Sequence, residues 1–581
     1  MRERLSQKDS VTLEQARHYH MQGCYPQAEA SYQSLLRKYP TSSSIQNLLG
    51  ALMIDRGDPA DAIPLLKRAT RHNKKDANNH YNLGLALAET GKHEDAIKAY
   101  RRAISIEPRH NKAHYNLGHS LRKLERDLEA VAALERDYAL EARFDTCRAL
   151  ARTLMKLEDY DGALTYANRC VELEGAGLED LNLLVLLLCR KYALAATITP
   201  AQIDELTTLA HHAVNLSPSD VAALVNLGRA LSQLGDFGGA LAPLKKAVQL
   251  DPEHDSAHSL YGIALLTEGE LEQGWHERTL LSRMQKPVTP TGVPRWSGEL
   301  EAGMTLWVTR EQGVGDQFLY ARMLKDLVDA GIDVTLVCEE RVMPILARSM
   351  PGVHLTTRIT TDEQAGYDAF ASLGELHLHL RRSMNDIPTA IPYLRPDAVR
   401  TGEFRARYSE LYPDKRVTGL AWLSHSDVNG AGKSVPLDDL LPILTMPDRV
   451  FVCVQYGRGW DELRKHAAVH GYMVHFDEDC NSLDDLDLGA AQLAALDELV
   501  SVSNASVHMA GAMGVRCHVL VGQRPVWHWF SATARPDHRS PWYTDVNLYR
   551  QQELASWATP IAELKAAIET QGPPPWRLPD E

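Results

Sequence analysis

The first half of the chain repeats one pattern every 34 residues. Gly50, Gly84 and Gly118 are 34 residues apart, and each follows a leucine. Twelve residues after each glycine stands a small residue, and four residues later a large one: Ala62, Ala96 and Ala130, then Leu66, Tyr100 and Leu134. The pattern returns at Gly228. This period predicts stacked helix pairs, with small residues where two helices cross and large residues beside them.

Two segments carry the pattern most completely: YNLGLALAETGKHEDAIKAYRRAISIEP and YNLGHSLRKLERDLEA. They resemble the tetratricopeptide repeat, and the resemblance implies an α solenoid over residues 1–288. From Gly118 to Gly228 is 110 residues, which is not a multiple of 34. We therefore expect degenerate repeats with a small insertion within residues 145–220.

Asparagines recur on the predicted repeat helices. An amide side chain both donates and accepts hydrogen bonds, so it can bind the backbone of an extended peptide. The resemblance to peptide-binding solenoids implies a protein-acceptor surface at Asn78, Asn82, Asn111 and Asn116. The alternative is that these asparagines only face solvent.

The composition favours a protein of the reducing cytoplasm. The formal net charge is -14, and an acidic surface repels nucleic acid and anionic membranes. No two of the eight cysteines form a C-x-x-C pair, which argues against a disulfide framework. The first ten residues are polar, and the longest apolar run, 181–189, is too short to cross a bilayer. We expect a cytoplasmic protein with no membrane span.

The second half has a different periodicity. Three prolines and three glycines between 285 and 303 predict a linker, which we place at 289–303. Short β-rich runs then alternate with helical stretches, at 304–309, 332–338, 417–423, 449–456, 496–502 and 517–522. Alternation of this kind predicts a doubly wound α/β architecture with parallel strands. We divide it into two Rossmann-like lobes, 304–400 and 401–581.

Two turns at strand ends are candidates for ligand binding, because open α/β sheets bind ligands there. The first runs from Arg310 to Gln317 and contains Gly313, Gly315 and Asp316. Glycines allow a ligand to approach the backbone, and the start of a helix favours negative charge. Asp316 is suited to act as a base or as a helix cap.

The second turn, SVSNASVHMAGAMG (501–514), follows the predicted strand 496–502. It places hydroxyl, amide and imidazole groups at the start of a helix, which suits a diphosphate through backbone donors, hydroxyl donors and one cation. The alternative for His508 is a helix-surface or core histidine without a binding role.

The two turns, in this order and spacing, resemble the inverting glycosyltransferases of the GT-B fold. They are similar to the heptosyltransferase-related enzymes that bacteria fuse to tetratricopeptide repeats. PGVHL (351–355), YDAFASLGEL (367–376), IPYL (391–394) and SPWYTDVNLYRQ (540–551) add to the likeness, which spans about 296–570. It implies a metal-independent transferase that needs no cofactor besides its co-substrate, a nucleotide sugar.

The resemblance also implies roles for single residues. Asp316 corresponds to the proposed general base, which deprotonates the acceptor hydroxyl. Lys433 is the nearest candidate for a lysine that neutralises the leaving phosphate. The donor-binding residues are Gly313, Gly315, Gln317, Lys433, Ser503, Asn504, Ser506, His508 and Gly511.

One departure from the family pattern affects this interpretation. Relatives usually carry Asp-Thr where this chain has Asn504-Ala505. The change suggests either an altered donor or a site that has lost its chemistry. Retention of Asp316 and His508 favours an active enzyme.

No metal site is expected. Asp484, Asp485 and Asp487 lie in a polar stretch that predicts solvated surface. His466 and His470 are four residues apart on one predicted helix face, but no third ligand with suitable spacing follows, so we expect an exposed pair.

Fusion of repeats to a transferase suggests a protein acceptor. The expected activity is sugar transfer to Ser or Thr hydroxyls of a protein held by the repeats, with flagellin as one acceptor that the resemblance associates with this architecture. One alternative is a non-catalytic repeat scaffold with a degenerate transferase-like domain. Another is a transferase for carbohydrate or lipid acceptors.

Overall fold

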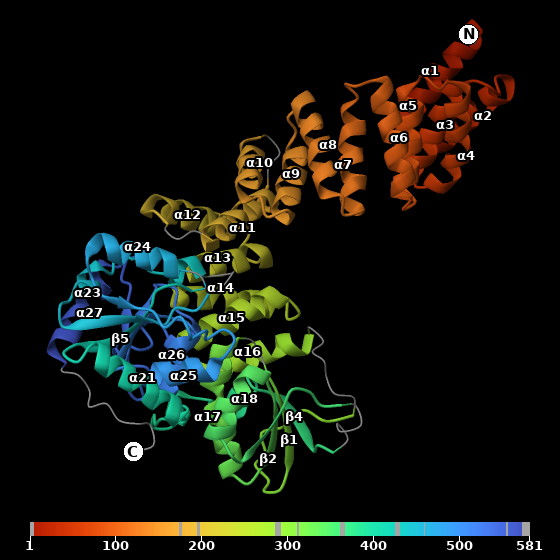
Figure 1. The fold of residues 1–581 in the computed structure, drawn as a ribbon. Helices are drawn as coiled ribbons and strands as arrows, with labels where there is room; N and C mark the ends of the chain where they lie inside the picture. The colour runs from red at the N-terminus through yellow and green to blue at the C-terminus, as the bar shows by residue number, and fades with distance from the viewer. Residues whose placement is uncertain are drawn as a thin grey trace. The chain divides into compact units, whose positions relative to one another are not determined.

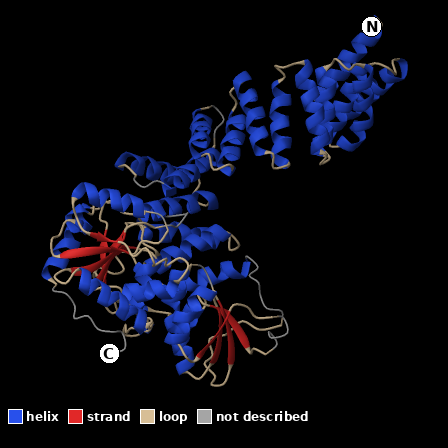
Figure 2. Cartoon of the chain, viewed as in Figure 1, coloured by secondary structure: helices blue, strands red, loops and turns tan. Residues whose placement is uncertain are grey.

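A computed structural model describes residues 5–173, 177–194, 198–284, 292–310, 313–360, 366–424, 430–457, 459–553 and 556–571. The chain divides into two compact units, Met1–Leu188 and Cys189–Glu581. The first unit is all helical, and the second combines helices with two parallel sheets (Figure 2).

The first unit is a stack of helix pairs, seen in Figure 1 from α1 to α10. The predicted solenoid is confirmed in this region. The helices are α1 (Gln7–Met21), α2 (Tyr25–Lys38), α3 (Ser43–Arg56), α4 (Pro59–His72), α5 (Ala77–Glu89), α6 (His93–Ile106), α7 (Asn111–Lys123), α8 (Asp127–Leu140), α9 (Phe144–Lys156) and α10 (Tyr160–Glu172). Helix α11 (Leu178–Leu194) runs from the first unit into the second.

The glycines of the 34-residue pattern lie where the two helices of a pair cross. A Cβ at Gly50, Gly84 or Gly118 would be 2.6 Å from a carbon of the large residue that faces it, respectively Leu66, Tyr100 and Leu134. Each of these three large residues is fully buried. The spacing of small and large residues in the sequence therefore reflects how the two helices of each pair pack against each other.

The second unit begins with more helix pairs of the same kind. They comprise α12 (Pro200–Leu216), α13 (Val221–Gln233), α14 (Phe237–Leu250), α15 (Asp255–Thr267) and α16 (Leu271–Met284). Gly228 on α13 faces Leu244 on α14, as the repeat pattern predicts.

Substitution of Gly228 tests whether the small residue is needed where the two helices cross. We expect Gly228→Ala to lower the free energy of unfolding by about 1–3 kcal/mol, because the new methyl group would overlap the Leu244 side chain. Gly238→Ala, ten residues along on α14, is the control, because a Cβ there meets nothing within 4 Å. Glycine is the weaker helix former, so this control should be neutral or slightly stabilising. Urea unfolding measures the free energy of unfolding of both variants, and equal effects of the two substitutions would contradict this packing requirement.

The last helix pair shares a hydrophobic core with the first sheet. Leu266, Leu271 and Trp275 belong to the same buried cluster as Leu306 and Phe318. These repeats are therefore built into the sheet-containing body.

Aromatic contacts strengthen this junction. The Trp275 ring stacks on His377 at 4.4 Å between centroids and meets Trp527 edge-on at 5.0 Å. The backbone amide of Ser531 donates to the carbonyl of Thr267, at the end of α15, at 2.8 Å. Helix α16 therefore contacts residues near both sheets through Trp275, and the end of α15 is hydrogen-bonded to the segment after η3.

The first sheet has four parallel strands in the order β3-β2-β1-β4. They are β1 (Thr305–Thr309), β2 (Asp333–Val337), β3 (Val353–Thr356) and β4 (Ala369–Ser372). Its associated helices are α17 (Val314–Asp329), η1 (Glu340–Val342), α18 (Met343–Ser349), α20 (Leu376–Leu380), η2 (Met384–Asp386) and α21 (Ala398–Leu411).

The second sheet has six parallel strands in the order β10-β9-β8-β5-β6-β7. They are β5 (Arg416–Ala421), β6 (Arg449–Cys453), β7 (Val474–His475), β8 (Glu498–Val502), β9 (Cys517–Val521) and β10 (Val546–Arg550). The helices of this part are α22 (Gly430–Lys433), α23 (Leu441–Leu444), α24 (Trp460–His470), α25 (Leu486–Ala494), α26 (Ala505–Ala512), η3 (Trp527–Trp529) and α27 (Ala558–Thr570). The predicted parallel α/β architecture is confirmed, and all six predicted runs contain a strand.

Part of the predicted linker is packed against the first sheet. The backbone amide of Trp296 donates to the Phe370 carbonyl at 2.8 Å, and that of Phe370 donates to Pro294 at 2.9 Å. The side chains of Val293 and Trp296 are buried. Residues 285–291 lie outside the described part of the chain. The boundaries at 288, 303 and 400 stay predictions.

Within the described ranges, every helix falls short of the length and apolarity that crossing a membrane requires.

Candidate active site

The first predicted turn places Asp316 at the start of α17. Strand β1 ends at Thr309, and Gly313 is the N-cap residue of α17 with extended backbone and no side-chain cap. Asp316 lies in the first helical turn, where the helix dipole favours negative charge. Glu311 and Gln312 of the same turn lie outside the described residues.

Gly315 allows α17 to approach the second turn closely. A Cβ at Gly315 would be 3.0 Å from Cδ2 of His508 and 3.3 Å from Cα of Ala505. A side chain there would press against the start of α26, so its neighbours would have to shift. The glycine is thus explained by packing between the two candidate turns.

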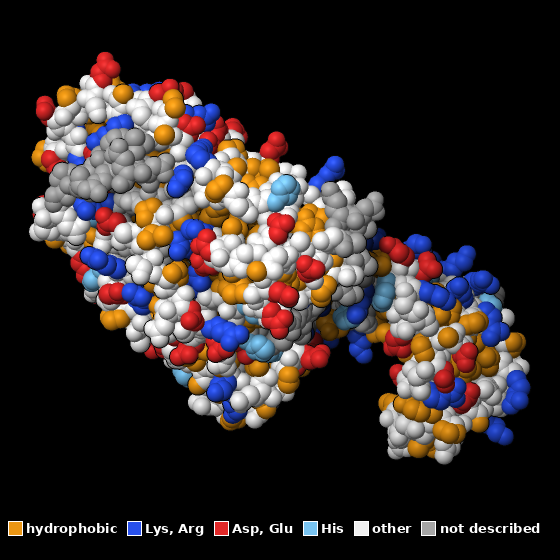
Figure 3. Space-filling model, turned by 90° about the horizontal axis from the view of Figure 1, so that it is seen from below, with side chains coloured by type: hydrophobic (Ala, Val, Ile, Leu, Met, Phe, Trp, Pro, Cys, Tyr) orange, Lys and Arg blue, Asp and Glu red, His pale blue; other side chains and the backbone are white. Residues whose placement is uncertain are grey.

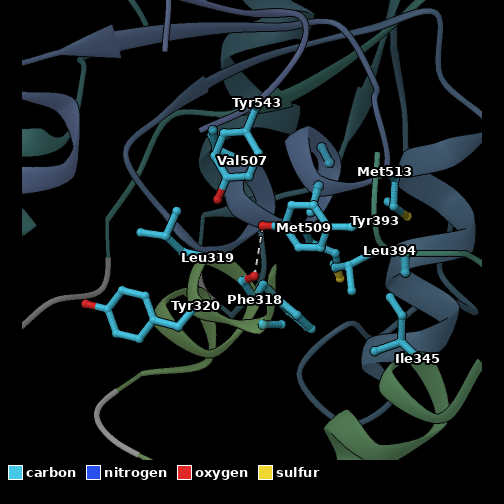
Figure 4. Packing of buried hydrophobic residues seen from close by; sticks show 14 of the residues in the cluster. Phe318, Leu319, Tyr320, Ile345, Tyr393, Leu394, Val507, Met509, Met513 and Tyr543 are labelled. Carbon is cyan, nitrogen blue, oxygen red and sulfur yellow. Dashed lines mark hydrogen bonds between the residues drawn. The ribbon is translucent and has the colours of Figure 1, made fainter. Parts of the chain in front are cut away.

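Apolar side chains pack between helices α17 and α26 (Figure 4). Tyr393, from the segment before α21, donates from its hydroxyl to the Phe318 carbonyl of α17 at 3.0 Å. The backbone amide of Tyr393 donates to the Ala512 carbonyl at the end of α26, at 2.8 Å. The positions of the two strand-end turns are therefore fixed relative to each other.

Asn504 caps helix α26. Its Oδ1 accepts hydrogen bonds from the backbone amides of Ser506 at 3.1 Å and Val507 at 3.4 Å. Its Nδ2 is buried and makes no hydrogen bond to any described residue. Asparagine thus caps the helix through its oxygen and keeps a buried amide donor without a negative charge.

His508 is held as a neutral side chain. Its Nδ1 is 2.8 Å from the Tyr543 hydroxyl, and its ring stacks on Trp529 at 5.2 Å. Burial, assisted by the charge of Lys433, lowers the pKa of His508 to about 3. The expectation that this turn supplies a cation is therefore corrected: His508 offers a hydrogen-bonding imidazole, because it is almost fully desolvated.

One cavity of about 780 Å³ brings the two turns together. Its wall includes Gly313, Gly315 and Asp316 from the first turn. From the second turn and the loop after β5 it includes Ser503, Asn504, Ser506, His508 and Lys433. All of these residues belong to the second compact unit. The carboxyl ends of β1, β5 and β8 therefore meet around a single space.

The cavity is cationic although the chain is acidic. The described residues that line it include six basic side chains, Arg190, Arg229, Arg278, Arg341, Lys433 and Arg524, and a single acidic one, Asp316. On the outer face seen in Figure 3, acidic and basic side chains are interspersed. A cavity with this charge attracts an anionic ligand.

Lys433 and Asp316 interact electrostatically across this space. Burial lowers the pKa of Lys433, and the nearby charge of Asp316 partly offsets that effect. A carboxylate and an ammonium group thus lie in the same cavity as the N-terminal end of α26. Residues 425–429, in the loop before Lys433, lie outside the described chain.

Two predicted donor-binding residues do not line the cavity. Gln317 is buried within α17, with 2% of its surface exposed. Gly511 lies on the packed side of α26, where a Cβ would be 2.8 Å from Cγ of Tyr543. Both residues lie on the expected helices, α17 and α26, but neither is among the described residues that line the cavity.

Ser503 lines the cavity and also supports its wall. The indole Nε1 of Trp529 donates to Ser503 Oγ at 2.8 Å. The serine hydroxyl keeps its own proton to donate, so a binding role is compatible with this contact.

The four predicted acceptor-binding asparagines lie in the first compact unit. Asn82 Nδ2 donates to Asn47 Oδ1 at 3.0 Å, and Asn116 Nδ2 donates to the Tyr81 hydroxyl at 3.1 Å. Asn111 Nδ2 donates to Glu141 at 2.9 Å. Asn78 is exposed. Three of the four side chains therefore bridge neighbouring helices, and their acceptor role stays a prediction.

The sequence analysis did not predict several of the residues that line the cavity. Arg524 lies three residues after the end of strand β9, so the rule that ligands gather at strand ends could have found it. Arg190 and Arg229 come from the repeat helices α11 and α13, and the sequence carries no local signal that they face this cavity. His528 also lines it, and its two ring nitrogens make no hydrogen bond within the described structure.

The histidine pair on α24 does have a third neighbour. His466 Nε2 is 3.1 Å from Asp438 Oδ1, and His470 Nε2 is 3.9 Å from the same oxygen. The three groups could meet around one ion, although Asp438 and His470 are exposed. The expectation of a pair without a third ligand is corrected, because Asp438 precedes the pair in the sequence.

Comparisons with known proteins identify the repeats. Residues 13–77, 53–108, 81–143 and 207–273 match a sequence profile of the tetratricopeptide repeat, and residues 145–176 match a second such profile. Protein FlbA of Caulobacter vibrioides is 29% identical over 379 residues, which cover 61% of this chain and 62% of FlbA. The chain thus spans about three fifths of the length of that curated relative.

Two solved structures are similar to part of this chain. YrrB, described as a tetratricopeptide repeat protein with an unusual peptide-binding site, is 24% identical, with 33% of this chain and 95% of YrrB covered and a TM-score of 0.30. PilF of Pseudomonas aeruginosa is 18% identical, with 37% and 94% covered and a TM-score of 0.33. On the strength of the matched profiles, the N-terminal region of this chain is an array of tetratricopeptide repeats.

Proposed function

We propose that the chain is an inverting, metal-independent glycosyltransferase of the GT-B type. It transfers a sugar from a nucleotide-sugar donor to Ser or Thr hydroxyls of a protein that the repeats recruit. The observation that carries the proposal is the single cationic cavity between Asp316 and the start of α26. Two parallel sheets with helices, and a cavity at the ends of their strands, are consistent with a two-lobed transferase.

The α26 side of the cavity suits a diphosphate. Asn504 supplies an unpaired buried Nδ2, Ser503 and Ser506 supply hydroxyls, and Lys433 supplies a positive charge. Charge-assisted hydrogen bonds of this kind are roughly twice as strong as neutral ones. They would stabilise the negative charge that develops on the leaving phosphate oxygen.

Asp316 would act as the general base. Its carboxylate accepts the proton of the acceptor hydroxyl while the hydroxyl oxygen attacks the anomeric carbon. The bond from that carbon to the phosphate oxygen breaks, and its electron pair leaves with the nucleoside diphosphate. The configuration at the anomeric carbon is inverted, because attack and departure occur on opposite faces.

A protein acceptor agrees with the repeats, because tetratricopeptide arrays bind protein segments. Flagellin is the first acceptor to test. The proposal is tested by incubating the full chain with a panel of nucleotide sugars and measuring nucleotide release with and without candidate acceptors. We expect release from one donor, increased by a protein acceptor and accompanied by a mass increase of that acceptor.

Other results would favour the alternatives. If no donor is consumed with any acceptor, the non-catalytic scaffold is the better explanation. If a carbohydrate or lipid acceptor stimulates release and proteins do not, the enzyme is a transferase of a different acceptor class.

A further inference from the structure

The repeats do more than adjoin the cavity, because they contribute two of its cations. Arg229 lies on α13 and Arg190 on α11, and both line the same space as Asp316 and Asn504. Ser232 and Gln233, at the end of α13, line it as well. One wall of the candidate active site is therefore made by repeat helices.

Arg229 is a half-buried cation without a counter-charge. Its Nε is buried and makes no hydrogen bond, and no ion pair joins its guanidinium to the described carboxylates. Desolvation is the main cause that lowers the pKa of Arg229, and the neighbouring positive charge of Arg190 adds to it. Partial burial of the Arg229 cation beside a second positive charge is unfavourable unless an anion binds there; Arg190 itself is exposed.

Two of the other cavity arginines have contacts of their own. Arg341 is paired with Glu339 at 2.8 Å, and Arg278 lies over the Trp275 ring at 5.9 Å. Within the described chain, no carboxylate forms an ion pair with Arg229, Arg190 or Arg524, so this side of the cavity has an excess of positive charge.

Arg524 connects this pair to the α26 side of the cavity. Its Nη1 donates to the Tyr192 carbonyl, near the end of α11, at 3.4 Å. Its Nη2 lies 2.8 Å from the position that a Cβ of Gly432 would occupy, next to Lys433. Positive groups therefore continue from Lys433 through Arg524 to the end of α11 that carries Arg190.

We propose that Arg229, with Arg190 beside it, binds a phosphate group of the substrate, so that the repeats form part of the phosphate-binding site. In the proposed function this phosphate belongs to the nucleotide-sugar donor. The repeat helices then have two roles, because they hold the donor as well as recruit the acceptor.

The test measures binding of pyrophosphate to the full chain by titration calorimetry. We expect Arg229→Gln to weaken binding about tenfold or more, which corresponds to about 1.4 kcal/mol, because the variant loses a charge-assisted hydrogen bond to the phosphate. Arg229→Lys should retain part of the affinity. Arg382→Gln, an exposed arginine that does not line the cavity, is the matched control and should bind like the unchanged protein.

Thermal melting without ligand separates binding from folding. Arg229→Gln should melt no earlier than the unchanged protein, because it removes an uncompensated charge. If it does melt earlier, Arg229→Lys decides: retained affinity supports the phosphate role, and affinity as low as that of Arg229→Gln overturns it. The inference is also overturned if Arg229→Gln binds pyrophosphate normally, or if the unchanged protein does not bind it.

These results are distinguishable from failure of the proposed function. Pyrophosphate binding that depends on Arg229, without turnover of any nucleotide sugar, would support the phosphate site and refute the transferase. Sugar transfer with unchanged pyrophosphate affinity in Arg229→Gln would support the transferase and refute the role of Arg229.

Discussion

Asp316→Asn should lower the turnover number for sugar transfer by about 10²–10⁴-fold, the range that a general base contributes. The asparagine keeps the size of the side chain but cannot take a proton at neutral pH. The cavity that Asp316 lines is otherwise unchanged, so donor affinity should change much less than turnover. Initial rates of nucleotide release in the presence of acceptor measure the turnover, and titration of the donor measures the affinity.

The control for Asp316→Asn must reproduce its effect on the helix. Asp316 lies in the first turn of α17, and Asp461 lies in the first turn of α24, where it is exposed. Loss of a first-turn carboxylate costs about 0.3–1 kcal/mol of stability through the helix dipole. Asp461→Asn should show this small cost without any loss of activity. A rate for Asp316→Asn equal to that of the unchanged enzyme would refute the assignment of the base.

Lys433→Gln should lower kcat/KM by about 10²–10³-fold, the effect of removing one group that stabilises the developing negative charge. Lys433 is a cavity cation in electrostatic contact with Asp316. Lys433→Arg restores the charge and should recover part of the activity. Lys465→Gln, an exposed lysine on α24, is the matched control and should leave kcat/KM unchanged. If Lys433→Gln behaves like this control, the leaving phosphate is stabilised elsewhere.

The same lysine predicts a pH dependence. Burial lowers the pKa of Lys433 below that of a free lysine. When the pH is raised, Lys433 therefore loses its positive charge earlier than a free lysine would. Activity should therefore fall on the alkaline side, through this lowered pKa. In Lys433→Arg the fall should move to higher pH, because an arginine keeps its charge.

The sequence predicts the elements because their signals are local. The 34-residue spacing of Gly50, Gly84 and Gly118 reflects a contact that each helix pair makes within itself. The strands before Asp316 and Asn504 are mostly buried and mostly apolar, a pattern that the sequence shows directly, although β8 also buries Glu498 and Ser501. The rule on strand ends then brings the two turns together, and both do line one cavity.

The remainder of the site depends on tertiary contacts. Arg229 lines the cavity, and the repeats that carry it are joined to the core of the first sheet through residues such as Leu271 and Trp275. Gly511 looks like a phosphate-binding glycine, but it serves the contact with Tyr543. A single sequence does not reveal which of two uses a glycine serves, since both require the absence of a side chain.

A crystal structure of the full chain grown with nucleoside diphosphates tests the binding site most directly. We predict that one of them binds in the cavity with its phosphates at the start of α26, within hydrogen-bonding distance of Asn504 Nδ2 and Lys433 Nζ. The Asp316 carboxylate should face the space next to the terminal phosphate. A nucleotide bound outside this cavity, or a cavity that stays empty at saturating concentrations of every diphosphate, would contradict the proposed function.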